Sequence, residues 1–237
     1  MGMIQQHLFF DGVDINDFGA LPYQGNVFAS AQRDYEAISV PGRNGALLID
    51  RGGYANVTRR WDVIFSGDDV AGKAARLRSF LTTRTGYRRI EDTLHPDEYC
   101  LGCFRGGLDS DIPVVRYARY SLEFDCKPQR FLKSGEAVTV LTASGVIVNP
   151  EPTTARPLIR VYGSGTVTVG GTSFTVASSD NAYVDIDSEI EDAYCGAVNC
   201  NSLVSLTDFP TLPAGETEVT PGNGVSRIEI KPRWWRL

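Results

Sequence analysis

The sequence predicts a mostly β protein of two domains: an α+β domain, in which one helix covers an antiparallel sheet, and then a β-sandwich. Apolar and polar residues alternate along Val57 to Phe65 and Val114 to Lys127, and a single stretch repeats at helical spacing. After Phe131 the composition changes, and short strands separated by turns follow one another. We therefore place the domains at residues 1–135 and 136–237.

The chain begins with a predicted hairpin and a predicted loop. Residues 7–15 carry apolar side chains on both sides of Asp11-Gly12, a pair typical of a hairpin turn. Residues 16–30 show no clean period and contain several glycine and proline residues, so we expect a loop there. An extended pattern over residues 31–40 predicts the next strand.

The stretch from Pro41 to Asn56 is the most unusual in the chain, because glycine and proline punctuate it between two predicted strands. A long loop in a compact domain is usually functional or disordered. Two interpretations stay open: an arm that docks on a neighbouring subunit, and an ordinary surface Ω-loop. The candidate subunit-interface residues are Pro41, Gly42, Arg43, Asn44, Asp50, Arg51, Tyr54 and Asn56.

An amphipathic helix follows. Its apolar residues recur at helical spacing, and Ser66 followed by Asp69 has the spacing of a capping box. Residues 87–94 and 97–104 then predict a second pair of strands around His95-Pro96. The apolar face of the helix consists of Val70, Ala74, Leu77 and Leu81.

Three prolines make residues 142–157 a stiff linker or crossing strand. The short strands beyond it predict the sandwich, and Gly170-Gly171 predicts a tight hairpin turn inside it. The predicted strands cover 157–163, 165–170, 172–177, 183–190 and 225–231.

Charge and hydropathy limit the function classes. The net charge of -6 argues against binding nucleic acid by neutralising phosphates, although nucleic acid could still pass through an acidic channel. No signal-peptide pattern and no apolar run of about 18 residues is visible. We expect a protein that stays in the cytoplasm unless a larger assembly carries it out, and that has no membrane anchor.

No residue pattern predicts catalysis or a cofactor. Five cysteines include two close pairs, Cys100 with Cys103 and Cys195 with Cys200, which have the spacing of half a zinc site but more often are buried thiols. No nucleophile has a visible base, and the C-terminal half contains no histidine. We therefore expect no enzyme, no cofactor and no metal.

An acidic cluster has three possible roles. Its carboxylates alternate along a predicted strand, so they suit a glycosidase pair, a calcium site or simply the solvated face of a strand edge. The cluster consists of Asp185, Asp187, Glu189, Glu191 and Asp192. Near the C-terminus, Trp234 and Trp235 either close the sandwich core or form an exposed aromatic platform.

In the order of its motifs the chain resembles the distal tail (Dit) protein family of siphophages, the long non-contractile-tailed bacteriophages. The resemblance covers both halves. It rests on Val40-Pro-Gly-Arg-Asn-Gly45, Asp50-Arg-Gly-Gly-Tyr-Ala-Asn56, the helix after Phe65, Pro157-Leu-Ile-Arg-Val-Tyr-Gly-Ser-Gly-Thr166, Val184-Asp-Ile-Asp187, Ala193-Tyr194, Phe209-Pro-Thr-Leu-Pro-Ala-Gly215 and Ile230-Lys-Pro-Arg-Trp-Trp-Arg-Leu237.

The resemblance implies a structural protein of the virion tail, assembled in the host bacterial cytoplasm. Its N-terminal domain would form a homo-hexameric ring that joins the tail tube protein to the tail tip or baseplate and lets DNA pass. Tail-tip or tail-associated fibre proteins would be partners, as would receptor-binding proteins. The C-terminal domain would be a galectin-like sandwich, although this half lacks the histidine of the galectin sugar site.

Two other hypotheses remain. One is a carbohydrate-binding β-sandwich protein for attachment to a host surface, with Trp234, Trp235 and Tyr194 as stacking surfaces. The other is a glycosidase that uses the acidic cluster. Sixfold assembly is expected of the tail protein only.

Overall fold

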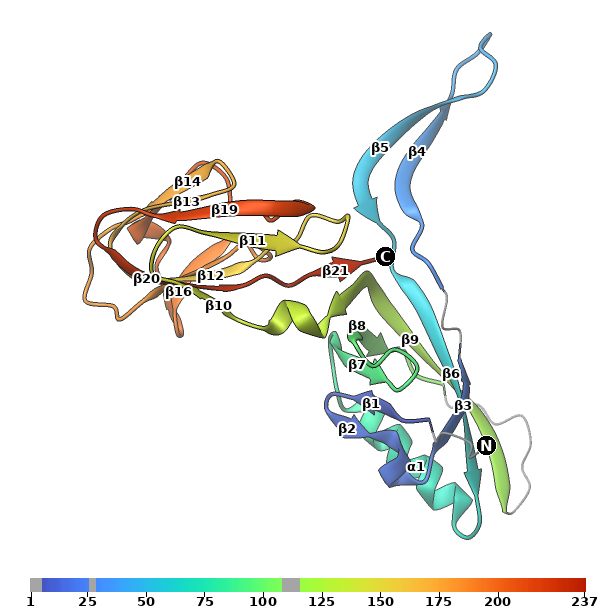
Figure 1. Ribbon diagram of the computed structural model, residues 1–237. Helices are drawn as coiled ribbons and strands as arrows, with labels where there is room; N and C mark the ends of the chain where they lie inside the picture. Colours follow the sequence, from blue (N-terminus) through green and yellow to red (C-terminus); the bar gives the residue numbers. More distant parts are fainter. Residues whose placement is uncertain (1–5, 26–28, 108–115) are drawn as a thin grey trace. The chain divides into compact units, whose positions relative to one another are not determined.

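The computed structural model describes residues 6–25, 29–107 and 116–237. The chain divides into two compact units, one of residues up to Arg130 together with Leu237, and one of Phe131–Arg236 (Figure 1). The predicted loop over 16–30 and the predicted strand Val114 to Lys127 reach into residues 26–28 and 114–115, which lie outside the described residues.

The first unit is built on one sheet with the strand order β2-β1-β7-β8-β9-β6-β3. The predicted N-terminal hairpin forms, with Phe10 paired to Val13 across the Asp11-Gly12 turn. The loop predicted over 16–30 is wrong in part, because a short 3-10 helix and β3 form there. The strands are β1 Leu8–Phe10, β2 Val13–Asp14, β3 Leu21–Gly25, β6 Val57–Ser66, β7 Arg88–Asp92, β8 Glu98–Phe104 and β9 Tyr117–Leu132, and the 3-10 helix η1 is Ile15–Phe18.

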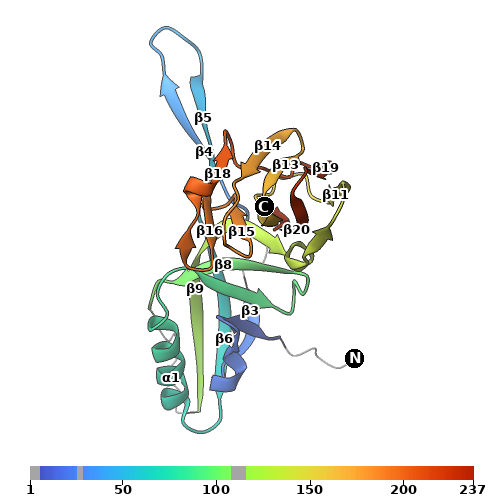
Figure 2. The same cartoon turned by 90° about the vertical axis from the view of Figure 1, so that its left-hand side faces the viewer.

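The predicted helix is α1, Val70–Thr82, and it lies along β6 and β9 (Figure 2). The four predicted apolar residues are its buried residues, so its apolar stripe faces the sheet. The predicted capping box is wrong. Asp69 itself is the N-cap and accepts a hydrogen bond from the backbone N–H of Gly72 at 3.1 Å, because the helix begins one turn later than Ser66 requires.

Aromatic side chains fill the core between α1 and the sheet. Phe124 packs within 5.2 Å of Phe10 and 5.6 Å of Trp61, measured between ring centroids, and Phe65 stacks edge-on against Tyr120. Trp61 and Phe65 lie at alternating positions of β6, as Tyr120 and Phe124 do on β9, which places these rings on one face of the sheet.

Two further strands, β4 Arg33–Ser39 and β5 Ala46–Tyr54, pair with each other and with no other strand in the part of the chain that the structure describes. The prediction of a loop over Pro41 to Asn56 is therefore wrong for most of its length. Only the turn between Val40 and Gly45 and the connection after Tyr54 lack strand structure. The apolar run Ala46 to Ile49 lies opposite Glu36 to Ser39, which supplies the backbone partners that a strand needs.

The second unit is the predicted sandwich. One sheet has the order β10-β20-β12-β15-β16-β17, the other β11-β19-β13-β14-β18. Short 3-10 helices η2, Lys133–Glu136, and η3, Asn201–Leu203, accompany them. The strands of the two sheets are β10 Thr139–Leu141, β11 Gly145–Asn149, β12 Leu158–Gly163, β13 Gly165–Val169, β14 Thr172–Val176, β15 Val184–Asp187, β16 Asp192–Cys195, β17 Val198–Asn199, β18 Val204–Leu206, β19 Gly215–Pro221 and β20 Val225–Lys231. One more strand, β21 Trp235–Arg236, belongs to neither of these sheets.

The sandwich core holds the inward residues of both sheets, among them Ile159, Phe174 and Ile228. Trp234 is 6% exposed and belongs to this core, which confirms that it closes the sandwich. Within the segment 142–157, residues of β11 pair with β19, from Gly145 opposite Val219 to Asn149 opposite Gly215.

Candidate functional site

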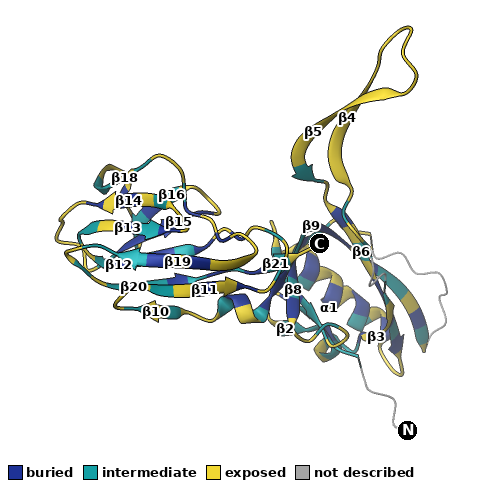
Figure 3. Ribbon diagram, turned by 45° about the horizontal axis from the view of Figure 1, so that its top comes forward, coloured by how far each residue is buried: buried dark blue, intermediate teal, exposed yellow. Residues whose placement is uncertain are grey.

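The candidate site is the hairpin of β4 and β5, hereafter the arm, residues 33–54. Every residue from 32 to 52 is exposed, and Figure 3 shows the arm almost entirely in the colour of exposed residues. None of its residues belongs to either hydrophobic core. The arm is therefore held by its own cross-strand contacts and not by burial.

The tip of the arm carries the first four predicted interface residues. The backbone N–H of Arg43 donates to the carbonyl of Val40 at 3.1 Å, which closes a four-residue turn. Pro41 stands at its second position and Gly42, with φ of 78°, at its third, the combination that a type II turn requires. Asn44 is the first residue after this turn. The Arg43 guanidinium has no ion-pair partner among the described residues.

Cross-strand ion pairs stiffen the base of the arm. Arg33 contacts Asp50 at 2.6 Å and Arg51 contacts Glu36 at 2.9 Å. Asp50 also accepts from the backbone N–H of Gly52 at 2.8 Å. The hydrogen bond from Arg33, helped by that of Gly52, lowers the pKa of Asp50 below its usual range, and the same pair raises the pKa of Arg33.

The last two predicted residues mark where the arm joins the first unit. The guanidinium carbon of Arg33 lies 5.6 Å from the ring centroid of Tyr54, at the end of β5. Asn56 is not on the arm. Its side-chain amide donates to the hydroxyl of Tyr87 at 2.6 Å and to Asp125 at 3.2 Å, so it anchors the connection between β5 and β6.

The prediction missed the apolar residues of the arm. Cross-strand register puts Ile38 and Leu47 on one face, and Tyr35 and Leu48 on the other. The apolar run Ala46 to Ile49 is typical of a strand, but the glycines around it favoured the prediction of a loop. The exposed fractions are 55% for Tyr35, 37% for Ile38, 37% for Val40, 42% for Leu47, 62% for Leu48 and 44% for Ile49.

An isolated two-stranded hairpin is marginally stable in water, and one with apolar residues on both faces gains stability when a second surface covers it. The arm offers such a surface three kinds of contact: apolar side chains on two faces, an unpaired cation at Arg43, and the free backbone edges of β4 and β5. The arrangement suits protein–protein docking.

The acidic cluster holds two ion pairs whose carboxylates are buried. Asp185 and Asp187 are 3% and 4% exposed, so the solvated strand face considered for the cluster is wrong for both. Arg160 contacts the two carboxylate oxygens of Asp185 at 2.7 and 2.9 Å, and Arg233 contacts those of Asp187 at 2.6 and 2.8 Å. Each of these two carboxylates is ion-paired with an arginine, an arrangement that stabilises the fold.

The surroundings of Asp187 shift two pKa values. Burial alone raises the pKa of Asp187, but the hydrogen bonds and charge of Arg233 outweigh it and leave the pKa below its usual value. Burial, together with the nearby charge of Asp187, raises the pKa of Tyr194. An exposed platform of Trp234, Trp235 and Tyr194 is not formed, because Trp234 is buried in the core.

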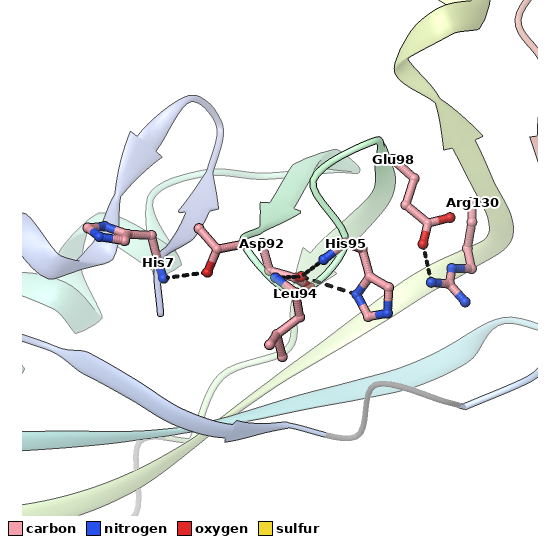
Figure 4. Close-up of polar contacts among 7 residues, drawn as sticks. His7, Asp92, Leu94, His95, Glu98 and Arg130 are labelled. Carbon is pink, nitrogen blue, oxygen red and sulfur yellow. Dashed lines mark hydrogen bonds and ion pairs between the residues drawn. The ribbon is translucent and has the colours of Figure 1, made fainter. Parts of the chain in front are cut away.

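A small polar cluster lies at the β7–β8 turn (Figure 4). Asp92 accepts from the backbone N–H groups of Leu94 and His95 at 2.9 and 2.8 Å, and lies 3.1 Å from Nδ1 of His95. Glu98 pairs with Arg130. The adjacent cavity measures about 10 Å³, room for about one water molecule. The hydrogen bonds of Asp92 hold the turn in shape.

The described cysteines are free thiols, with Cys100, Cys126 and Cys200 buried. A hydrogen bond to Cys100, followed by burial, raises the pKa of the Cys126 thiol. Among the described residues no three histidine, cysteine or acidic side chains gather as metal ligands would. No helix in the described residues has the length and apolar character needed to cross a membrane.

Comparisons with solved structures place the fold. The crystal structure of the SPP1 Dit (gp 19.1) protein, described as a paradigm of the hub adsorption apparatus in phages that infect Gram-positive hosts, matches with a TM-score of 0.75 and 16% identity. The match covers 98% of this chain and 99% of that one. The chain therefore has the Dit fold over nearly its whole length, as the sequence resemblance predicted.

Chains of the phage p2 baseplate match as well. The activated baseplate with Sr gives a TM-score of 0.57 at 10% identity, covering 100% of this chain and 99% of that one. The activated baseplate with Ca gives 0.55 at 10% identity, covering 96% and 97%. No protein-family model and no curated protein sequence matches the chain.

Proposed function

We propose that this chain is a structural distal tail protein of a siphophage or prophage and acts in the virion tail, after assembly in the host bacterial cytoplasm. A homo-hexameric ring of its N-terminal domain, residues 1–135, would join the tail tube protein to the tail tip or baseplate and let DNA pass. The C-terminal sandwich, residues 136–237, would face tail-associated fibre or receptor-binding proteins. The whole-chain likeness to the SPP1 Dit hub protein supports this role.

The observation that carries the ring is the exposed arm. A ring of identical subunits needs two different, complementary patches on each subunit. The arm supplies one, with its uncovered apolar residues and its unpaired Arg43. We assign the other to the sheet edge at β3, which within the described residues has a strand neighbour on one side only and exposes Leu21 and Tyr23 at 39% and 38%.

The proposed role is mechanical and non-enzymatic. The net charge of -6 suits a channel through which DNA moves, because an acidic wall repels phosphates and does not hold them. Asp185 and Asp187 are each ion-paired with an arginine, so these two carboxylates are not free to act as the catalytic pair of a glycosidase. This disfavours the glycosidase hypothesis.

Mass in solution tests the ring. Six copies of the 25.9 kDa chain weigh about 155 kDa, and negative-stain images of that species should show an open sixfold ring. A protein that stays monomeric, alone and when co-expressed with the tail tube protein of the same phage, contradicts the proposed ring.

A charge placed on the arm tests its role. We expect Leu48→Lys to shift the mass from the ring to the monomer, because it puts a cation on an apolar contact, while the far-ultraviolet circular dichroism spectrum stays that of the folded wild type. Val198→Lys is the matched control, since the two side chains are 62% and 63% exposed and Val198 lies in the sandwich. Rings formed by Leu48→Lys, and by a protein that lacks residues 34–53, would show that the arm does not hold the ring.

A further inference from the structure

The second unit contains a groove of about 510 Å³ that none of the contacts described above uses. It lies where β14 begins and β15 and β18 end, and its volume falls in the range of small-ligand sites. Its lining includes Ser188 and Glu191, after β15, and the segment Leu206 to Phe209, which begins with the last residue of β18.

Ser188 at this groove is an unusual residue. It is 1% exposed, and its Oγ has no hydrogen-bond partner among the described residues. A buried hydroxyl without a partner is costly, and most buried polar groups in proteins have one. Because Ser188 lines the groove, a donor or acceptor bound there is the nearest candidate partner for this hydroxyl.

The charges of the groove select against anions. Arg156 is paired with Glu191 at 3.1 Å across the groove, so its charge is largely balanced. Asp208 has no ion-pair partner among the described residues and leaves the lining with one net negative charge. A phosphate or a nucleic acid would be repelled, whereas the Asp208 carboxylate is a strong acceptor for hydroxyl donors.

The apolar part of the groove is small. Phe209 packs against the sandwich core and is half-buried, and Leu206 stands beside it. This is too little apolar surface to anchor the side chains of a docking peptide, but an aromatic ring suits the C–H face of a sugar. Thr207 adds a hydroxyl on the same segment.

We infer that the groove binds a neutral saccharide. Sugar hydroxyls would donate to Asp208 and exchange hydrogen bonds with Ser188 and Thr207, while one face of the ring lies on Phe209. The site uses no histidine and no tryptophan. This inference goes beyond the tail-hub role and does not depend on ring assembly.

Saturation-transfer NMR on the full chain tests the inference, because the method works on a monomer and on a ring alike. The probes are glucose, galactose and N-acetylglucosamine, each titrated separately. We expect a saturable signal for at least one of them, with a dissociation constant on the order of 1 mM, as is usual for a ligand of this size.

Two variants locate the site. Ser188→Ala should weaken binding about tenfold, the effect of one lost hydrogen bond, without lowering the melting temperature, because the hydroxyl has no protein partner to lose. Asp208→Asn should weaken it by a similar factor. Ser205→Ala is the matched control, since Ser205 is exposed on β18 and does not line the groove.

Three results are decisive. Binding that falls in both groove variants and persists in Ser205→Ala supports the saccharide site. The absence of a saturable signal for all three sugars overturns it. Binding that is equal in the wild type, Ser188→Ala and Asp208→Asn overturns it as well, and would mean that the Ser188 hydroxyl serves only a bound water.

Discussion

Arg233 and Asp187 lie 46 positions apart in the sequence and form two parallel hydrogen bonds, from Nη1 to Oδ1 at 2.6 Å and from Nη2 to Oδ2 at 2.8 Å. Arg233 also has a φ of 62°, a left-handed conformation that a residue with a side chain rarely adopts. The pair thus holds the last residues of the chain against β15 in a strained turn, which the bidentate contact stabilises.

The first prediction concerns this pair. Asp187→Asn should lower the free energy of unfolding by about 2–4 kcal/mol, because it leaves the largely buried guanidinium of Arg233 without its counter-charge. Chemical denaturation measures the change. Asp180→Asn, at an exposed position of the same unit, is the control and should change the free energy of unfolding by less than about 0.5 kcal/mol.

The second prediction is the pH dependence of that difference. The pKa of Asp187 is lowered in the folded protein, so the pair stabilises the fold above the ordinary carboxyl pKa of about 3.9 and loses this contribution as the pH falls through the folded pKa. The gap in unfolding free energy between the wild type and Asp187→Asn should therefore narrow below about pH 4. A gap that is constant down to pH 2 would contradict the assignment.

The third prediction tests the start of α1. Asp69→Ala should destabilise the first unit by about 1 kcal/mol or slightly more, because it removes the N-cap acceptor at a residue whose φ is 57°. Ser66→Ala should have no measurable effect, since the Ser66 side chain does not cap the helix. If thermal unfolding showed equal losses of stability in the two variants, Ser66 would cap the helix and the predicted capping box would be correct.

The fourth prediction concerns Gly135. A Cβ there would lie 2.3 Å from the backbone nitrogen of Trp234, and backbone atoms cannot swing away as a flexible side chain can. Gly135→Ala should therefore cost about 2 kcal/mol or more by displacing the segment that carries Trp234. Gly53→Ala is the matched control: no atom lies within 4 Å of its added Cβ, so thermal unfolding should show no loss.

The fifth prediction concerns the arm. Asp50→Ala removes both the ion pair with Arg33 and the hydrogen bond to the backbone N–H of Gly52. Amides of β4 and β5 should exchange hydrogen faster, while the melting temperature stays the same because no arm residue is in either core. Unchanged exchange would mean that the backbone ladder alone holds the hairpin.

The sequence by itself determined the elements whose pattern is local. Alternation along Tyr120, Leu122, Phe124 and Cys126 predicted a strand with one buried face, and all but the half-buried Tyr120 are fully buried. The spacing from Val70 to Leu81 predicted the helix and its buried face. Such periods depend only on which side of a strand or helix faces the core. They can therefore be read from the sequence without knowing which distant segments pack against that side.

Only the tertiary structure decided what depends on a distant partner. Asp185 and Asp187 have the pattern of a solvated strand face, yet both are buried, because Arg160 on β12 and Arg233 between β20 and β21 supply the counter-charges. In the arm, the bend at Gly52 looked like loop in the sequence. The Asp50 carboxylate accepts a hydrogen bond from the backbone N–H of Gly52, and β5 stays paired with β4 on both sides of this glycine. The strand therefore continues to Tyr54.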